Sequence, residues 1–286
     1  AELVREHAVT LVIVEHVFNI PKVLDLATTV WTIRDSKIQI ESPDDVRKET
    51  FHDEGDALRP WLTELAGSED AITDFDLPGG ALLSCVQLDP SRAGEPGLDV
   101  DNLVVHRGRR PVIGRTSADG TVEGLSFKVP RGAIAVLQAP NGWGKTTFLE
   151  ALSGIIPTAS GEMRIYGTAV QRLPTWSRIA KGLAVMQSRD NAFPNLSVDE
   201  SLNLAQVDAP PENVRPFMGR RISDLSGGER QKVAAACSLG KAKGTVTILD
   251  EPFGMLDIAS IPKLQAEIAN NTSGATLILV PAASQS

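Results

Sequence analysis

The stretch that decides the fold of this chain reads Ala139-Pro140-Asn141-Gly142-Trp143-Gly144-Lys145-Thr146-Thr147. Apolar residues 133–138 precede it and predict a strand, and a helix is predicted over about residues 145–153. A glycine-rich turn between a strand and a helix aims backbone N–H groups at an anion, in front of the positive end of the helix dipole. The stretch therefore predicts a phosphate-binding loop (P-loop) in an α/β protein. A chance glycine-rich turn fits poorly with Gly-Lys-Thr-Thr directly after an apolar strand.

Each residue type in this loop suits one part of a nucleotide. Gly142 and Gly144 let the backbone approach the phosphates, and Lys145 supplies a charge for the β- and γ-phosphates. Thr146 offers a hydroxyl to Mg²⁺, and Thr147 offers a hydrogen bond near the α-phosphate. The candidate nucleotide-binding residues are Asn141, Gly142, Trp143, Gly144, Lys145, Thr146 and Thr147.

The general pattern of such loops has glycine where this chain has Ala139. Alanine costs little unless its φ angle is positive, because glycine alone adopts positive φ without a steric penalty. We therefore expect nucleotide binding to be weakened by this alanine rather than abolished.

A second motif places two acids at the end of a buried strand. Thr245–Leu249 predicts the strand, and Asp250 and Glu251 follow it. Ligands of α/β sheets bind at the carboxyl ends of the strands. Asp250 would hold Mg²⁺ through water, and Glu251 would polarise an attacking water molecule. An acidic turn without chemistry is common in isolation, but it is a weak alternative this far behind a P-loop.

The third motif is Leu225-Ser226-Gly227-Gly228-Glu229-Arg230-Gln231, whose two glycines open a helix predicted over Glu229–Leu239. Taken alone it predicts an ordinary capped helix, because a serine followed three residues later by a glutamate is the spacing of a capping box. Together with the P-loop and the acidic strand end, it favours a functional signature instead.

Composition restricts the kinds of partner. A net charge of −8 argues against a broad nucleic-acid surface, which is usually basic. The two cysteines, Cys85 and Cys237, fit no disulfide or metal framework, which favours a reducing, cytosolic setting. No apolar run approaches the ~20 residues that span a bilayer. We therefore expect contact with a membrane to run through a partner.

A repeated stretch predicts two related domains. Residues 9–16 read VTLVIVEH and residues 275–282 read ATLILVPA, and each is typical of a strand buried on both faces of a parallel sheet. One element present twice indicates two domains, of which the chain carries unequal parts. Strands alternate with helices in the second part, which favours an α/β fold with a parallel sheet.

The three motifs together resemble those of the ATP-binding cassette (ABC) ATPases, the motor subunits of ABC transporters. The resemblance covers about residues 99–282, and residues 1–67 resemble the C-terminal end of another cassette. We therefore expect a first-cassette remnant over 1–67, a linker over 68–98 with one possible short strand, and a C-terminally truncated second cassette over 99–286. The implied fold is a P-loop NTPase with a parallel core sheet, a small antiparallel β subdomain and a helical subdomain.

The resemblance implies ATP and Mg²⁺ as cofactors and a head-to-tail dimer with a second cassette, homo- or heteromeric. In that dimer, Ser226, Gly227, Gly228 and Glu229 of one cassette would contact the ATP held by the P-loop of the other. The stretch Gly254-Met255-Leu256-Asp257 matches the D-loop of the family. Asp257 would therefore lie at the interface.

Some family positions are altered. Arg107 stands where the family stacks an aromatic residue on adenine, and a planar guanidinium also stacks on a base. The glutamine linked to Mg²⁺ is expected at Ser188, so the neighbouring Gln187 is the candidate ligand, with an exposed strand-end residue as the alternative. The switch histidine after the last strand is His16 in the first copy but Ala282 in the second.

Connecting phrases such as ALSGIIPTASGEMRIYG (151–167) and AFPNLSVDESLNLA (192–205) are closest to importers of branched-chain amino acids and related amides. The leading hypothesis is an ATP hydrolase on the inner face of the cell membrane, docked on a permease near residues 186–200. It would serve a substrate-binding protein indirectly and bind no nucleic acid. The alternatives are a degenerate nucleotide-binding fragment, favoured by Ala139 and Ala282, and a non-transport cassette protein acting on nucleic acid.

Overall fold

The computed structural model describes residues 12, 24, 27–34, 37–49, 54–116, 122–188, 192–240, 245–257, 259–271 and 273–282. The expected switch histidine His16 lies outside these residues, as does the first copy of the repeat apart from Val12. Across the described part of the chain, no helix is both long enough and apolar enough to cross a membrane.

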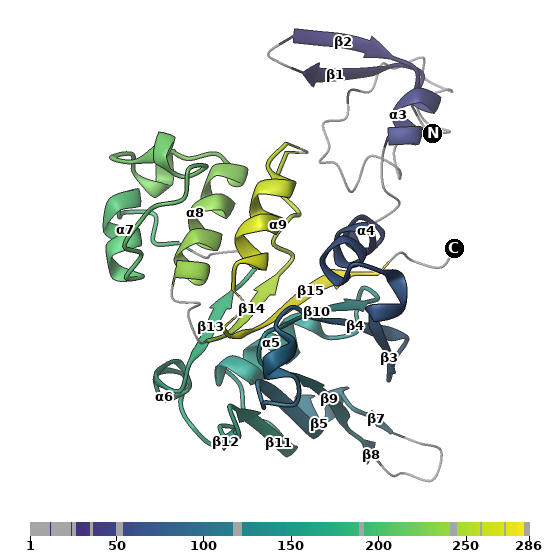
Figure 1. Cartoon of the computed structure of the whole chain (residues 1–286), viewed down its shortest axis with the longest axis vertical. Coiled ribbons are helices and arrows are strands. Elements are labelled where there is room, and N and C mark those ends of the chain that lie inside the picture. The colour runs from purple at the N-terminus through teal and green to yellow at the C-terminus, as the bar shows by residue number, and fades with distance from the viewer. Residues whose placement is uncertain are drawn as a thin grey trace.

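A six-stranded sheet forms the centre of the molecule (Figure 1). In spatial order its strands are β13 (Leu183–Met186), β14 (Val246–Asp250), β15 (Ala275–Pro281), β10 (Ala133–Ala139), β4 (Ala81–Gln87) and β3 (Thr73–Leu77). The first four run parallel, whereas β4 pairs with β10, and β3 with β4, in antiparallel fashion. The predicted α/β fold with a parallel core sheet is confirmed.

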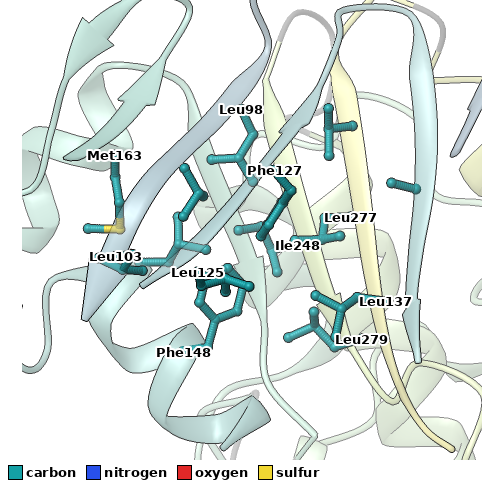
Figure 2. Packing of buried hydrophobic residues seen from close by; sticks show 14 of the residues in the cluster. Leu98, Leu103, Leu125, Phe127, Leu137, Phe148, Met163, Ile248, Leu277 and Leu279 are labelled. Carbon is teal, nitrogen blue, oxygen red and sulfur yellow. The ribbon is translucent and has the colours of Figure 1, made fainter. Parts of the chain in front are cut away.

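A smaller antiparallel layer packs against this sheet, as expected. Its strands are β5 (Leu98–Arg107), β6 (Arg110–Ile113), β9 (Leu125–Val129), β11 (Ser160–Ile165) and β12 (Thr168–Ala169), with a ribbon of β7 (Arg115–Thr116) and β8 (Val122–Glu123) nearby. Figure 2 shows Leu125 and Phe127 of this layer in one buried cluster with Leu137 and Leu277 of the central sheet, beside Phe148.

Helices cover the sheet and form a separate helical part. They are α3 (Pro43–Glu49), α4 (Glu54–Ala66), α5 (Lys145–Ser153), α6 (Thr175–Ala180), α7 (Val198–Leu204), α8 (Gly227–Gly240) and α9 (Ile261–Ala269). Single 3₁₀ turns lie at Glu69–Ala71, Pro90–Arg92, Arg215–Phe217 and Ile222–Asp224. In Figure 1, α7 and α8 lie side by side, away from β11 and β12. They share a small core of their own that includes Leu202, Leu225 and Val233.

Helix α4, which lies before residue 68, contributes to the core around the central sheet. A hairpin of β1 (Val30–Arg34) and β2 (Lys37–Glu41) comes first. Helix α4 then buries Leu58, Trp61 and Leu62 in one cluster with Ile134 of β10 and Val280 of β15. The chain therefore uses α4 as a cover for the central sheet.

The predicted linker over 68–98 is wrong for most of its length, because β3 and β4 extend the central sheet there. The Arg59 side chain of α4 fixes this addition, since its Nη1 lies 2.9 Å from Asp74 Oδ1 of β3. The Ser84 hydroxyl of β4 donates to the same oxygen at 2.6 Å. The sequence of β3 does not predict a strand, because β3 is an edge strand with four exposed residues. The short strand expected inside the linker is β4.

Candidate nucleotide-binding site

The P-loop joins the end of β10 to the start of α5, as predicted. Gly142 and Gly144 have φ angles of +86° and +110°, which is the left-handed region that favours glycine. A Cβ atom on Gly144 would lie 2.7 Å from Val112 Cγ1 and 3.0 Å from Ile113 Cδ1, so glycine alone fits there. The loop therefore depends on glycine for backbone shape and for close packing against β6.

Ala139, which replaces the family's glycine, causes no backbone strain. It is the last residue of β10, its side chain is buried in the main core cluster, and it is not among the described residues with positive φ. The condition under which alanine costs little is met at this position.

The carbonyl oxygen of Ala139 accepts two hydrogen bonds. Lys145 is buried at 9% exposure, and its Nζ donates to this oxygen at 3.1 Å. The backbone N–H of Ala282 donates to the same oxygen at 2.9 Å. The position expected for the switch histidine therefore lies directly beside the P-loop strand. At the start of α5, Thr146 is exposed and Thr147 is buried.

Arg107 lies beside the P-loop helix, where the resemblance placed its adenine-stacking residue. Its Nε donates to Thr147 Oγ1 at 3.3 Å, and its Nη2 forms an ion pair with Glu150 of α5. The contact brings a cation to the predicted nucleotide site. Stacking on adenine stays a prediction.

The acids lie at the carboxyl end of β14. Asp250 is 2% exposed, and burial raises the pKa of its carboxyl, with the neighbouring Glu251 carboxylate adding to the rise. Hydrogen bonds from the Ser188 hydroxyl and backbone N–H, and the charge of Lys145, oppose this rise in pKa. A buried carboxylate of this kind gains from a nearby cation. With the Thr146 hydroxyl it supplies the oxygen donors that Mg²⁺ prefers, so these residues fit the ion.

The loop after β13 brings Ser188 to Asp250, at the position that the family spacing gives for its glutamine. Gln187 is the preceding residue and stays only a predicted metal ligand. The sequence signal for Ser188 was its distance of five residues from Phe193, which is the spacing that the family gives for its glutamine.

Glu251 has a φ angle of +48°, an uncommon conformation for a residue with a side chain. Such a conformation costs about 1–3 kcal/mol and persists only where its surroundings hold it. The Glu251 N–H donates to Leu279 O at 2.9 Å. The buried Gln231 amide of α8 donates to the carbonyls of Glu251, at 3.1 Å, and Pro252, at 3.2 Å. The signature motif contains Gln231, but sequence reasoning assigned it no role, although its place on one helix face with Ala234 and Ala235 indicates a buried contact.

The signature forms the predicted capping box at the start of α8. Glu229 N–H donates to Ser226 Oγ at 3.3 Å, and Ser226 N–H donates to Glu229 Oε2 at 2.6 Å. These contacts and Arg220 lower the pKa of the Glu229 carboxyl, with the Ser226 N–H as the largest cause. A Cβ atom on Gly228 would lie 2.7 Å from the carbonyl oxygen of Met255, so the signature packs closely against the predicted D-loop.

Asp257 is exposed and bound within its own chain. Its carboxylate accepts hydrogen bonds from Ser260 N–H at 2.9 Å and from Ser260 Oγ at 2.7 Å, and Lys232 Nζ of α8 lies at 3.3 Å. Burial acts to raise the pKa of Asp257, but these contacts outweigh it and the pKa is lowered. The D-loop acid is therefore ionised and held to the signature helix.

The other end of the P-loop helix is capped by Arg178, which is 2% exposed. Its guanidinium donates to the carbonyl oxygens of Ala151, Leu152, Gln171 and Leu173. Burial lowers the pKa of Arg178, since its hydrogen-bond partners in the described structure are carbonyl groups rather than carboxylates. The negative end of the α5 dipole partly offsets that cost.

Comparison with known proteins agrees with this architecture. Residues 122–254 match the family model described as ABC transporter. A solved structure of an ATP-binding subunit of an ABC transporter superposes with a TM-score of 0.53 at 22% identity, over 64% of this chain and 78% of that one. The chain has the fold of an ATP-binding cassette ATPase.

Two curated relatives of this chain are named as ATP-binding proteins, one of transport and one of import. The probable branched-chain amino acid transport protein LivF of Archaeoglobus fulgidus is 36% identical, over 45% of this chain and 60% of the relative. The hemin import protein HmuV of Streptomyces coelicolor is 33% identical, over 59% of this chain and 62% of the relative. The alignments therefore span about three fifths of these relatives.

Within the cassette, the signature and the P-loop belong to different packing units. Helix α8 packs chiefly with α7, α9, β13 and β14, whereas α5 packs chiefly with β5, β6 and β14. One end of the central sheet carries the P-loop, Arg107, Asp250 and Ala282. The start of α8 carries Ser226 and Gly227.

Proposed function

We propose that this chain binds ATP with Mg²⁺ at the P-loop and hydrolyses it as the nucleotide-binding subunit of an ABC importer. The observation that carries the proposal is the approach of Lys145 and Asp250 at the carboxyl ends of β10 and β14, close enough for the lysine charge to act on the carboxylate. Parallel α/β sheets bind their ligands at this end.

The residues divide the chemistry between them. Lys145 and the loop N–H groups hold the β- and γ-phosphates, and Thr147 and Arg107 lie near the α-phosphate and the base. Thr146 and Asp250 would hold Mg²⁺, which would neutralise charge that develops on the phosphates. The Glu251 side chain accepts a hydrogen bond from the attacking water and orients it.

A second cassette completes the site. The signature residues Ser226, Gly227, Gly228 and Glu229 stand on the helical part of this chain, and we propose that they contact ATP on the P-loop of the partner cassette. Asp257, held by Ser260 and Lys232 beside the signature helix, would then face the same interface. The dimer is head-to-tail, with two ATP molecules between the cassettes.

The transported substrate is proposed to be a branched-chain amino acid or a related amide. The connecting phrases around residues 151–167 and 192–205 and the similarity to LivF support this choice. The chain would act on the inner face of the membrane, docked on a permease near residues 186–200, with a substrate-binding protein as an indirect partner. The net charge of −8 opposes a role on nucleic acid.

Calorimetric binding of ATP with Mg²⁺ to the purified chain tests the proposal. Lys145→Ala removes a charged donor to the phosphates and is expected to weaken binding about 10- to 100-fold. Glu251→Gln should keep binding and stop phosphate release. Equal affinity of Lys145→Ala and the wild type would show that the P-loop is wrongly assigned.

A second candidate function is a nucleotide-binding cassette with little turnover. Ala282 favours it, because the residue beside the P-loop strand carries no side chain able to bond the γ-phosphate. Ala282→His should then raise phosphate release from a wild type that binds ATP but scarcely hydrolyses it. Rapid hydrolysis by the wild type, abolished in Glu251→Gln, would rule this candidate out.

A further inference from the structure

The P-loop contacts a turn that lies outside the matched family region. The indole Nε1 of Trp143 donates a hydrogen bond to the carbonyl oxygen of Pro78 at 2.7 Å. Pro78 belongs to the turn over residues 78–80 between β3 and β4. Gly79 in this turn has a φ angle of +81°, and a Cβ atom there would lie 2.9 Å from Trp143 Cδ1. The indole therefore lies directly against the backbone of the turn.

The Trp143 ring is half-buried and packs against the main core cluster on one side. The Phe148 ring of α5 meets it edge-on with centroids 6.4 Å apart. A cavity of about 300 Å³ adjoins the loop, with Val112 and Leu125 among the residues that line it. Because the ring also borders this cavity, the hydrogen bond to Pro78 adds a directional restraint to the packing of Trp143.

The turn is itself firmly anchored. β4 pairs with β10 along the strand that feeds the P-loop, from Leu82 opposite Gln138 to Gln87 opposite Ala133. β3 is tied to α4 through the Arg59–Asp74 contact at 2.9 Å. The turn is therefore joined to β10 through β4, and Trp143 of the loop contacts this turn.

We infer that the β3–β4 turn supports the P-loop through Trp143 and holds its backbone in the phosphate-binding conformation. Trp143 is thus a positioning residue for the nucleotide, and the inference rests on the proposed ATP site. Phosphates are bound by backbone N–H groups of this loop, so a loop that is already ordered loses less entropy on binding. Within the loop, Trp143 follows Gly142, whose Cβ position is open space and offers no packing restraint of its own.

The test measures the affinity of the full chain for ATP with Mg²⁺ after removal of the indole donor. Trp143→Phe keeps a ring against Gly79 but loses the hydrogen bond to Pro78. Because one such bond contributes about 0.5–1.5 kcal/mol, the dissociation constant should rise by about two- to twelvefold at most. The melting temperature should change little, since one bond at the surface of the core is lost.

A matched pair of glycines gives the control. Gly79→Ala places a methyl group against the indole. Gly80 has a similar φ angle, but a methyl group there would lie 4.0 Å from the nearest atom, Pro140 Cγ. Gly79→Ala should weaken ATP binding and Gly80→Ala should weaken it much less. Gly79→Ala combined with Trp143→Phe should weaken binding less than the product of the two single effects, because both act on one contact.

Three results would overturn the inference. Unchanged affinity of Trp143→Phe, with normal wild-type binding that Lys145→Ala weakens, contradicts the support role alone. Equal effects of Gly79→Ala and Gly80→Ala contradict it as well, because they show that backbone strain rather than the indole contact matters. Absence of ATP binding by the wild type overturns both the proposed function and the support role.

Discussion

Two glycines of the P-loop differ in their surroundings, and alanine substitution separates backbone strain from steric clash. Both have φ in the left-handed region, at +86° for Gly142 and +110° for Gly144. A methyl group on Gly142 meets nothing within 4 Å, whereas one on Gly144 would lie 2.7 Å from Val112 Cγ1. The left-handed conformation costs alanine about 1–2 kcal/mol in either position. Overpacking adds about 1–3 kcal/mol for Gly144→Ala alone.

Urea unfolding of the nucleotide-free protein measures this difference. We expect Gly142→Ala to lose about 1–2 kcal/mol of unfolding free energy and Gly144→Ala about 2–5 kcal/mol. Val112 lines the cavity of about 300 Å³ and has room to yield, which favours the lower part of the second range. In a double-mutant cycle, Val112→Ala should recover part of the Gly144→Ala loss. Equal losses for the two glycines, or no recovery with Val112→Ala, would refute the reasoning.

Three further predictions concern buried polar groups. Arg178→Lys keeps a charge but cannot reach four carbonyls, so it should lower the unfolding free energy by about 2–4 kcal/mol; an unchanged urea midpoint would contradict this. Burial raises the pKa of Asp250, so its stabilising contribution is complete below about pH 4 and is lost as the pH rises through the folded-state pKa. Asp250→Asn should therefore raise the unfolding free energy of the nucleotide-free protein at pH 7 but not at pH 4. In this variant, Mg²⁺ should no longer strengthen ATP binding. Equal unfolding free energies of variant and wild type at pH 7 would contradict the prediction. Burial raises the pKa of Cys85 to about 11, so an alkylating reagent at pH 8 should modify Cys237 first, as peptide mapping would detect.

Local motifs made much of the site predictable. A strand, a glycine-rich turn and a helix follow one another within residues 133–153, so the geometry around Lys145 is fixed by neighbours in sequence. The same holds for the Ser226–Glu229 capping box and for the acids that end β14. Each of these depends on contacts over a few residues, which a sequence displays directly.

Contacts across long sequence separations were not predictable in this way. The bond from Trp143 to Pro78 joins residues 65 positions apart, and nothing in either local sequence specifies it. Gln231 reaches the Glu251 carbonyl from another helix in the same manner. β3 was missed because an edge strand with exposed aspartates lacks the apolar pattern on which strand prediction depends.

The parts that hold a nucleotide and the parts that act on it lie on different strands of this cassette. β10 and α5 carry Lys145 and the loop, both elements contribute to the main core cluster, and Ala139 is unstrained. β14 and β15 lead to Glu251, whose backbone is strained and held by Gln231, and to Ala282, whose side chain is a methyl group. In the proposed site, the absence of a longer side chain at 282 would lower turnover and leave the phosphate-binding loop undisturbed, because Ala282 bonds to the loop strand only through its backbone N–H.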